Sequence, residues 1–492
     1  MYWCRTFLVL CRLGARVTDW SDTTFCVAGI GIAGYAAADA LMQLDAHVTI
    51  VDESDGERQR ERSTILGELG AQVHLAHVGP VPDGIDVLVV SPGLKPASPL
   101  IVDAQSRGIE VWGELELAWR LRKPDAAAWL CVTGTNGKTT TTLMLESMLR
   151  AAGLRTVSAG NIGSSLVDAV MHDQLDVIAV EVGAPQMPFV TSMSPLASVC
   201  LNVAEDHVDH FGSMQAYTAA KARVYERTQV AAIYNVEDPE TERMVEAADV
   251  VEGCRAIGFT LGVPGLSMLG VVDDVIVDRA FIPNREREAQ ELALVSDVRP
   301  AAPHNVANAV AAAALARAYG VTASAVRDGL RGFEPAEHRI STVGSAGGVQ
   351  FVDDSKATNA HAAMTSLLAY PSVVWIAGGL AKGQDFDDLV VGARDRLRAV
   401  VLLGHDRAVL AGALARHAPN VPVSEVTKGE TGAMEEVVAR AMASALPGDT
   451  VLLAPGCASW DMFRDYADRG RQFAAAVRAL PGFTNAVLGG RA

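Results

Sequence analysis

The feature that most constrains this chain is a glycine-punctuated turn, residues 134–140, which reads Gly-Thr-Asn-Gly-Lys-Thr-Thr. It follows an apolar run at 129–132 and precedes a helix-like run at 141–149. In such a strand–loop–helix unit the glycines let backbone N–H groups approach phosphate oxygens, and the helix dipole favours an anion. Lys138 could reach a terminal phosphate and Thr139 could hold magnesium. The turn therefore predicts a polyphosphate site.

The turn departs from the usual phosphate-loop pattern, G-x-x-x-x-G-K, because Val132 stands where the first glycine belongs. It is therefore a shortened variant, and a chance Gly-Lys-Thr turn is the alternative. Downstream, Glu181 follows the buried-looking run 177–180, where such folds place a magnesium carboxylate. A solvated acid at a strand end is the other interpretation of Glu181.

Composition indicates a globular protein with room for roughly two to four domains. Hydrophobic residues make up 50 % of the 492 and charged residues 20 %, and the formal net charge of −17 disfavours a nucleic-acid surface. Seven cysteines without CxxC or Cys/His spacing predict reduced thiols in a cytoplasm, not disulfides or structural zinc. No apolar run reaches the roughly 18 residues of a membrane span.

The first residues carry Arg5 and a short apolar run at 7–11, a faint likeness to a signal peptide. The run is short for that purpose, and no small-residue cleavage site follows it. We therefore expect residues 1–23 to be an N-terminal extension, not a secretion signal.

A βαβ unit follows this extension. Apolar runs at 24–28 and 47–51 flank the turn Gly29-Ile-Gly-Ile-Ala-Gly34 and an alanine-rich helix, and the second run ends at Asp52. A GxGxxG turn with an acid about 20 residues later is the outline of a dinucleotide site, although any nucleotide ribose or pyrophosphate would suit it. A further strand near 85–90 leads into another glycine turn.

Strands and helices then alternate to the end of the chain, which favours α/β architecture with parallel sheets. In the middle segment we expect strands at 155–159, 176–182, 198–203 and 231–236 and a helix at 304–319. In the last segment we expect strands at 350–353, 373–377, 399–403 and 450–453. The predicted domains are 24–114, 115–336 and 337–492.

A cluster of polar residues follows the strand at 198–203. His207 and His210, with neighbouring acids Glu205, Asp206 and Asp209, could ligate zinc or contact substrate. A lone histidine at a strand exit is, however, more often a polar loop residue. The spacing alone leaves both interpretations open.

Several motifs occur in a fixed order: Gly134-Thr-Asn-Gly-Lys-Thr, Asn202-Val-Ala-Glu-Asp-His, Lys221, His304-Asn, His338-Arg, Asp354-Ser-Lys-Ala-Thr and Gly378-Gly. This series resembles that of the Mur ligases of peptidoglycan synthesis, over about residues 24 to 480. Within that family it is most similar to the members that add D-glutamate to UDP-N-acetylmuramoyl-L-alanine. The resemblance implies three α/β domains: an N-terminal Rossmann-like sheet that binds UDP, a central P-loop ATPase-like domain and a C-terminal Rossmann-like domain.

The resemblance also implies residue roles. For ATP and catalysis, Lys138 and Thr139 would hold phosphates and Mg²⁺, Glu181 and His207 would complete metal coordination, and Lys221 would be carbamylated to give a further anionic ligand. The alternative interpretation is that Lys221 is unmodified and is simply a lysine on the surface of a helix. The implied ATP-binding residues are Gly134, Thr135, Asn136, Gly137, Lys138, Thr139, Thr140, Asn305, Asn308, Arg339 and Asp354.

The implied substrate contacts fall at both ends of the chain. For the UDP-linked substrate they are Ile32, Asp52, Glu53, Gly93 and Asn161. For D-glutamate they are Lys356, Thr358, Lys382, Ser459 and Tyr466. Lysines and hydroxyls suit a dicarboxylate because each carboxylate needs charge-assisted donors. The enzyme is expected to be a cytoplasmic monomer without a nucleic-acid or membrane partner.

One stretch departs from the family pattern. After the catalytic acid the family reads Leu-Ser-Ser-Phe-Gln-Leu, whereas this chain reads Val182-Gly-Ala-Pro-Gln-Met, which removes two hydroxyls. Ala204 also replaces a threonine of the family. No Asp-Asn-Pro-Arg motif, which the diamino-acid-adding relative uses, is present.

The expected reaction is ATP-dependent amide formation through an acyl phosphate. Three alternatives remain open: a sister ligase of the Mur or folylpolyglutamate type with a different acceptor, an NAD-dependent dehydrogenase prompted by the GxGxxG turn, and a non-catalytic nucleotide-binding protein prompted by the altered stretch at 182–185. The dehydrogenase interpretation leaves the loop at 134–140 without a role.

Overall fold

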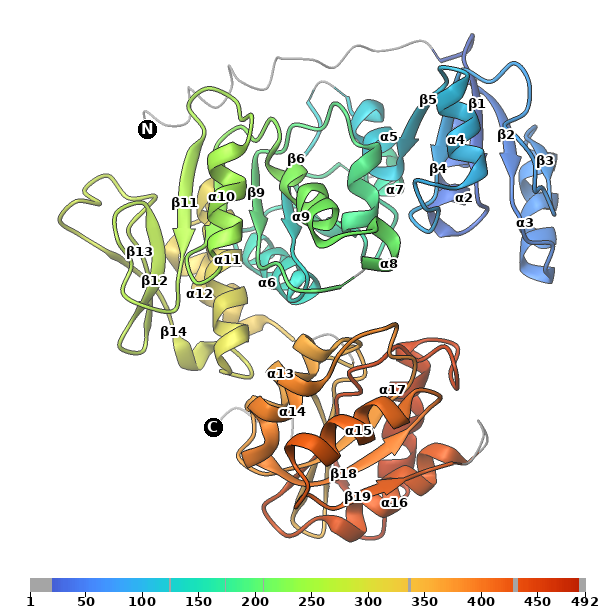
Figure 1. Cartoon of the computed structure of the whole chain (residues 1–492). Helices are drawn as coiled ribbons and strands as arrows, with labels where there is room; N and C mark the ends of the chain where they lie inside the picture. Colours follow the sequence, from blue (N-terminus) through green and yellow to red (C-terminus); the bar gives the residue numbers. More distant parts are fainter. Residues whose placement is uncertain are drawn as a thin grey trace. The chain divides into compact units, whose positions relative to one another are not determined.

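The computed structural model describes residues 20–123, 125–172, 174–206, 208–334, 338–427 and 432–485. They form two compact units: one holds the described residues up to Ala301 together with Asn305–Phe333, and the other holds Ala302–His304 and the chain from Glu334 onward. Three β-sheets with connecting helices on their faces organise these units (Figure 1). The predicted three-domain α/β fold is confirmed.

The first sheet is parallel throughout. In spatial order its strands are β3 (Gln72–His74), β2 (His47–Val51), β1 (Thr24–Ala28), β4 (Val87–Val90) and β5 (Glu110–Gly113). The connecting helices are α2 (Ile32–Met42), α3 (Glu57–Glu68) and α4 (Pro99–Ser106), and α5 (Glu114–Leu121) leads out of the sheet. Both β1 and β2 begin and end at the predicted residues, because buried apolar runs bounded by polar or glycine residues mark strands clearly.

The second sheet spans the middle of the chain. Its spatial order is β14 (Gln290–Leu294), β13 (Val275–Asp278), β12 (Met268–Val272), β11 (Arg255–Phe259), β10 (Ala231–Asn235), β9 (Ala197–Cys200), β6 (Ala128–Thr133), β8 (Val177–Glu181) and β7 (Thr156–Gly160). Its helices are α6 (Lys138–Ala151), α7 (Leu166–His172), α8 (Val208–Phe211), α9 (Met214–Ala222), α10 (Pro239–Ala247), α11 (Pro303–Tyr319) and α12 (Ala323–Gly332), with 3₁₀ turns η1 (Ala184–Phe189), η2 (Arg223–Tyr225) and η3 (Val295–Asp297).

The expectation of a parallel sheet is wrong at one edge of this domain, where β12, β13 and β14 pair antiparallel. Strands β12 and β13 are joined by only Asp273 and Asp274, and Asp273 adopts a positive φ of 53°. So short a connection can form a hairpin but cannot cross over to a parallel neighbour. The strand-to-strand link therefore dictates the antiparallel pairing.

The third sheet belongs to the second unit. Its order is β19 (Val423–Glu425), β18 (Leu397–Leu403), β17 (Val373–Gly378), β20 (Thr450–Leu453), β16 (Val349–Asp353), β15 (Ser341–Ala346) and β21 (Thr484–Asn485). Its helices are α13 (Ala360–Leu368), α14 (Asp387–Ala393), α15 (Arg407–His417), α16 (Ala433–Ser444) and α17 (Tyr466–Arg478), with the 3₁₀ turn η4 (Arg394–Arg396). The five strands from β19 to β16 are parallel, and β15 and β21 extend the sheet antiparallel.

The N-terminal and central domains share a hydrophobic core within the first unit. Phe25 and Trp112 of the first sheet belong to the same buried cluster as Trp129 and Val180 of the second. Trp20, which was predicted to lie in the N-terminal extension, also belongs to this cluster, and the centre of its ring is 5.3 Å from that of Phe25. Burial of this many large apolar side chains stabilises the arrangement of the two domains.

A buried carboxylate on α5 reinforces this contact. Glu116 accepts hydrogen bonds from the backbone N–H and hydroxyl groups of Thr191 and Ser192 and from Nε of Arg120. Burial alone would raise the pKa of Glu116, but these donors outweigh burial and lower it to about 2. The ionised form therefore ties α5 to the segment that follows η1.

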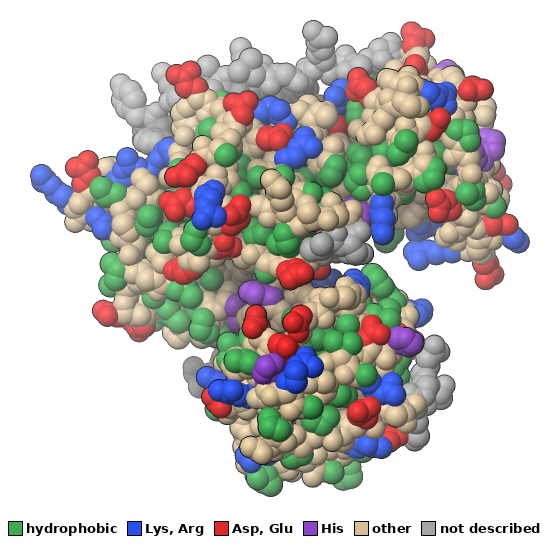
Figure 2. Space-filling model, in the orientation of Figure 1, with side chains coloured by type: hydrophobic (Ala, Val, Ile, Leu, Met, Phe, Trp, Pro, Cys, Tyr) green, Lys and Arg blue, Asp and Glu red, His purple; other side chains and the backbone are tan. Residues whose placement is uncertain are grey.

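The distribution of surface charge agrees with the negative net charge of the sequence. Lys and Arg side chains lie among Asp and Glu on the face shown in Figure 2, and they form no broad basic field there within the described residues. Across the described ranges, no helix is both long and apolar enough to cross a membrane.

Glu116→Gln tests the carboxylate at the domain contact. Because the folded-state pKa lies below the ordinary value near 4.5, ionised Glu116 contributes stability above that pH and loses it as the pH falls through about 2. We expect a loss of about 3 kcal/mol at pH 7 by urea unfolding, smaller at pH 3. The exposed Glu68→Gln is the matched control, and an equal loss in both variants would contradict the assignment.

Candidate active site

The phosphate loop connects the carboxyl end of β6 to α6, which confirms the predicted strand–loop–helix order, although the helix begins at Lys138 and not at Thr141. Gly137 has a φ of 84°, which disfavours a side chain, and a Cβ there would lie 2.4 Å from Oδ1 of Asn308. Asn308 of α11 therefore packs directly on the loop. Asn305, also buried on α11, donates from Nδ2 to the carbonyl of Pro300 at 3.2 Å.

Asn202, just after β9, fixes the shape of the loop. Its Oδ1 accepts the backbone N–H of Asn136 at 2.9 Å, and its Nδ2 donates to the carbonyl of Asn136 at 3.2 Å. The backbone carbonyl of Asn202 also accepts the N–H of Thr135 at 3.0 Å. The sequence motif beginning at Asn202 was recognised, but Asn202 was not predicted to belong to the site. Its place in that motif is the signal that could have identified it.

Glu181, the last residue of β8, links the start of α6 to the end of β7. Its Oε2 accepts the hydroxyl of Thr139 at 2.7 Å, and its Oε1 accepts Nδ2 of Asn161, just after β7, at 2.9 Å. The side chain is buried at 2 % exposure, so the alternative of a solvated strand-end acid is wrong. Predicted metal ligands Thr139 and Glu181 are thus adjacent, and their hard oxygens suit Mg²⁺.

Two lysines face the same region. Lys138 donates from Nζ to the carbonyls of Gly134 and Thr135 at 2.8 and 2.9 Å. Lys221 is buried at 1 % exposure, with its Nζ 4.4 Å from the centre of the Tyr217 ring. Burial, and secondarily the charge of Lys138, lowers the pKa of Lys221 to about 7. The surface-lysine interpretation of Lys221 is therefore wrong.

The histidine cluster is only partly described. His207 lies outside the described residues, so its place among metal ligands stays a prediction. In the described part of the chain, no group of three His, Cys, Asp or Glu side chains could hold a metal ion. Because His207 is outside these residues, the zinc alternative stays untested as well.

The predicted uridine contacts lie at one edge of the first sheet. Ile32 begins α2 after β1, Asp52 and Glu53 follow β2, and Gly93 follows β4, all at carboxyl ends of parallel strands. Asp52 accepts the backbone N–H of Ile30 at 2.8 Å and that of Ser54 at 2.8 Å, which fixes the glycine turn. Asn161, in contrast, lies at the end of β7 in the second sheet.

In the second unit, Asp354 follows β16 and is buried. It accepts the hydroxyl of Ser366 and, at 3.3 Å, the backbone N–H of Ile340. Burial raises the pKa of Asp354 to about 6, although Ser366 and the charge of Arg339 oppose the shift. The two predicted nucleotide contacts of this unit, Arg339 and Asp354, therefore interact electrostatically.

The predicted D-glutamate residues lie after the carboxyl ends of β16, β17 and β20. Lys356 Nζ is 3.7 Å from the centre of the Tyr466 ring, and the backbone N–H of Thr358 donates to the carbonyl of Lys356 at 2.8 Å. Lys382 and Ser459 occupy loops joined by a backbone bridge between Leu380 and Ala458. These loops therefore present both lysines at one edge of the sheet.

Arg469 of α17 is a residue that sequence reasoning missed. It is buried at 1 % exposure and donates to the hydroxyl and carbonyl of Ser355 at 2.9 and 2.8 Å and to the carbonyl of Cys457 at 3.1 Å. Burial lowers its pKa to about 10. A buried guanidinium thus fixes the two loops that carry Lys356 and Ser459, although nothing in the pattern around Arg469 indicates burial.

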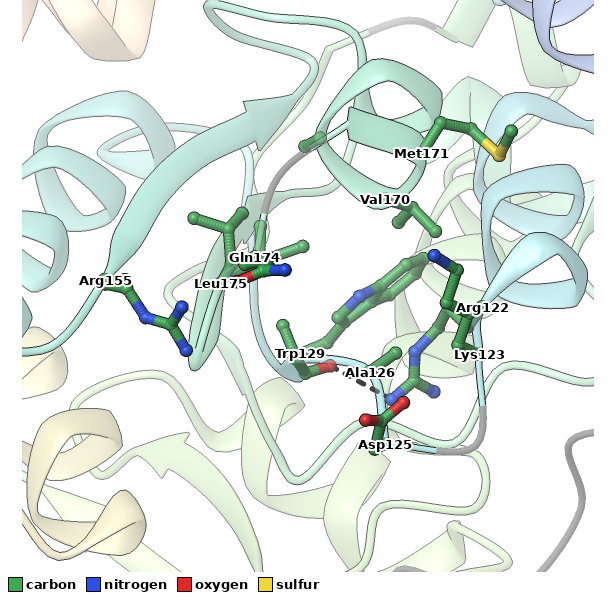
Figure 3. Close-up of a pocket in the computed structure, with 13 residues that line it drawn as sticks. Arg122, Lys123, Asp125, Ala126, Trp129, Arg155, Val170, Met171, Gln174 and Leu175 are labelled. Carbon is green, nitrogen blue, oxygen red and sulfur yellow. Dashed lines mark hydrogen bonds between the residues drawn. The ribbon is translucent and has the colours of Figure 1, made fainter.

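A cavity of about 460 Å³ lies at the opposite edge of the second sheet, near the amino ends of β6, β7 and β8. Figure 3 shows the Trp129 indole between Gln174 and the side chains of Arg122 and Lys123. None of the predicted site residues lines it. Because ligands of open α/β sheets bind at the carboxyl ends of strands, this cavity is separate from the candidate site.

The comparisons with known proteins agree with this geometry. The family models that match are the Mur ligase MurD-like N-terminal domain over residues 23–113, the Mur ligase middle domain over 132–316 and the Mur ligase glutamate ligase domain over 338–457. The chain belongs to the Mur ligase family.

Among curated Mur ligases, the UDP-N-acetylmuramoylalanine–D-glutamate ligase of Streptomyces avermitilis is 56 % identical over 94 % of this chain and 100 % of its own length. The enzyme of the same name from Thermobifida fusca is 52 % identical over 93 % of this chain and 98 % of its own.

Solved Mur ligase structures share the fold. UDP-N-acetylmuramate-alanine ligase from Thermotoga maritima superposes with a TM-score of 0.55 at 18 % identity, covering 93 % of this chain and 99 % of that one. The MurF ligase of the same organism, in complex with ADP, gives a TM-score of 0.56 at 15 % identity and covers 87 % of this chain and 94 % of its own.

The stretch that departs from the Mur ligase pattern leads into the 3₁₀ turn η1, which begins at Ala184. The N–H of Gly183 donates to Oε1 of Gln186 at 2.9 Å, which closes the turn, and Pro185 supplies a suitable fixed φ. A Cβ at Gly183 would lie 3.2 Å from that oxygen and 3.5 Å from the Asn161 amide. Gln186 therefore closes this loop without the two hydroxyls.

Asn202→Ala tests the support of the phosphate loop. Removing the two side-chain hydrogen bonds to Asn136 should loosen the N–H groups that face phosphate and weaken ATP binding about tenfold or more by isothermal calorimetry. The exposed Asn284→Ala serves as the matched control. Unchanged nucleotide affinity in the Asn202 variant would contradict this role.

Proposed function

We propose that this chain is an ATP-dependent ligase that joins D-glutamate to UDP-N-acetylmuramoyl-L-alanine, a step in peptidoglycan precursor synthesis for the cell wall. The observation that carries the proposal is the full-length similarity to ligases of that name. The adjacent Thr139 and Glu181 and the two lysines at the edge of the third sheet support it, because they suit a metal-bound polyphosphate and a dicarboxylate respectively.

The reaction would proceed through an acyl-phosphate intermediate. The carboxylate of the UDP-linked substrate attacks the γ-phosphorus of ATP, the bond to the β-phosphate oxygen breaks, and ADP leaves. The amine of D-glutamate then attacks the acyl carbon, and the tetrahedral intermediate collapses with release of inorganic phosphate. Phosphoryl transfer depends mainly on positioning and charge neutralisation, and Lys138 would supply a positive charge beside the phosphates.

The proposed residue roles follow from this scheme. ATP would contact Gly134 to Thr140, Asn305, Asn308, Arg339 and Asp354. Thr139, Glu181, His207 and carbamylated Lys221 would hold Mg²⁺, whose charge would stabilise the transferring phosphoryl group. The UDP-linked substrate would contact Ile32, Asp52, Glu53, Gly93 and Asn161, and D-glutamate would contact Lys356, Thr358, Lys382, Ser459 and Tyr466.

We also place the reaction in the cytoplasm, carried out by a monomer. The five cysteines in the described part of the chain are free thiols, and four of them are buried, which suits a reducing compartment.

A phosphate-release assay with four components tests the function. We expect release only when UDP-N-acetylmuramoyl-L-alanine, D-glutamate, ATP and magnesium are all present, and at least a hundredfold less with L-glutamate or D-alanine in place of D-glutamate. Lys138→Ala is the inactive control. Release with another acceptor would indicate a sister ligase, and ATP binding without release would indicate a non-catalytic protein.

The lowered pKa of Lys221 predicts how its carbamylation depends on pH. Carbon dioxide reacts with the neutral amine, so the reactive fraction rises through about pH 7 in this protein, whereas an ordinary lysine near 10.5 would stay protonated. With ¹³C-bicarbonate, a carbamate signal should grow between pH 6 and 8 in carbon NMR. The signal should be absent from Lys221→Arg, and its persistence there would contradict the assignment.

A further inference from the structure

Trp460 is unusual among the large side chains of the second unit. It is 66 % exposed, whereas the adjacent Ser459 is only 2 % exposed. A single exposed hydrophobic residue needs no explanation by itself. In this case, however, the exposed indole lies beside a residue already proposed to bind D-glutamate.

A lysine ammonium faces this indole. Nζ of Lys382 is 4.5 Å from the centre of the Trp460 ring. The other proposed carboxylate-binding lysine, Lys356, has the same type of partner in Tyr466, at 3.7 Å. The face of an aromatic ring attracts a cation, also at exposed positions. Each of the two lysines is therefore held by its own aromatic ring.

The backbones beneath Lys382 and Trp460 are joined. The N–H of Leu380 donates to the carbonyl of Ala458 at 2.9 Å, and the N–H of Ala458 donates back at 3.0 Å. Gly379 packs so closely that a Cβ there would lie 2.1 Å from the same carbonyl of Ala458. The distance from Lys382 to Trp460 is thus set by paired backbone and not by two independent loops.

Two aspartates fix these loops further. Oδ2 of Asp406 accepts the N–H of Ala381, the residue before Lys382, at 2.8 Å. Oδ2 of Asp461, the residue after Trp460, accepts the N–H of His405 at 2.7 Å. Lys382 itself has a positive φ of 53°, a conformation that a non-glycine residue adopts only when its surroundings impose it. The backbone therefore directs the lysine side chain.

We propose that Trp460 is a positioning residue for Lys382 and thereby raises the affinity for the dicarboxylate amino acid; this inference rests on the proposed function. An indole against one side of the ammonium leaves its remaining N–H groups available for a carboxylate. It also restricts a long side chain whose ordering would otherwise cost conformational entropy on substrate binding. The aromatic ring makes no bond to the substrate and acts only through the lysine.

Steady-state kinetics of Trp460→Leu test the proposal. We expect the KM for D-glutamate to rise roughly three- to tenfold, with kcat and the KM values for ATP and the UDP-linked substrate nearly unchanged. Trp460→Phe, which keeps an aromatic face, should restore most of the affinity. The control is Leu446→Ala, which changes another exposed residue of the same unit. An unchanged KM in Trp460→Leu would overturn the proposal.

A double-mutant cycle separates positioning from direct contact. If Trp460 acts through Lys382, Trp460→Leu should have no further effect in a Lys382→Met background. An equal rise in KM in both backgrounds would overturn the proposal in favour of direct substrate contact or a general loop effect. Thermal unfolding of each variant should match that of the wild type, because the indole is largely exposed.

A spectroscopic readout is independent of the reaction. In protein labelled with ¹³C-lysine, the ε-protons of Lys382 should show an upfield ring-current shift that disappears in Trp460→Leu. The signal of Lys382 is identified by its absence from the spectrum of Lys382→Met. A shift that is absent from the wild type would overturn the proposal even in an active ligase. A wild type that shows the shift but no release with D-glutamate would instead contradict the proposed function alone.

Discussion

The carboxylate of Glu181 is the interaction on which the candidate site depends most. Its two oxygens bind Thr139 at the start of α6 and Asn161 after β7, so the ends of β7 and β8 and the start of α6 are held at hydrogen-bond distance. An acid with 2 % exposure is tolerable only because both oxygens are paired. The same pairing directs two hard oxygen donors to one point, where the phosphate loop begins its helix.

Residues that support the site are distinct from those that would touch ligands. Asn202 fixes the phosphate loop from an adjacent strand, and Arg469 fixes two loops of the second unit from inside a helix. Both use several hydrogen bonds to backbone groups, which orient loops without occupying the space that a substrate needs. Their loss would alter geometry at a distance from the substituted position.

Sequence patterns predicted those parts of the molecule that local signals determine. Strands β1 and β2, the phosphate loop and the carboxylate of Glu181 each have a signal within a few residues, and the structure places them as expected. The hairpin at Asp273 was missed although its two-residue connection was visible. The burial of Arg469 and Lys221 could not be predicted, because polar side chains in helices are usually exposed and only tertiary packing makes these two exceptions.

The common core of the first two sheets has a consequence for substrate selection. Because Phe25 and Trp112 share one buried cluster with Trp129 and Val180, the sheet edge proposed to bind uridine and the phosphate loop belong to one compact unit. With the proposed contacts, packing would set the span between the nucleotide anchor and the reacting carboxylate. A precursor longer or shorter by one residue would then present the wrong atom to the loop, so this unit would select its acceptor by length without contacting the reacting end.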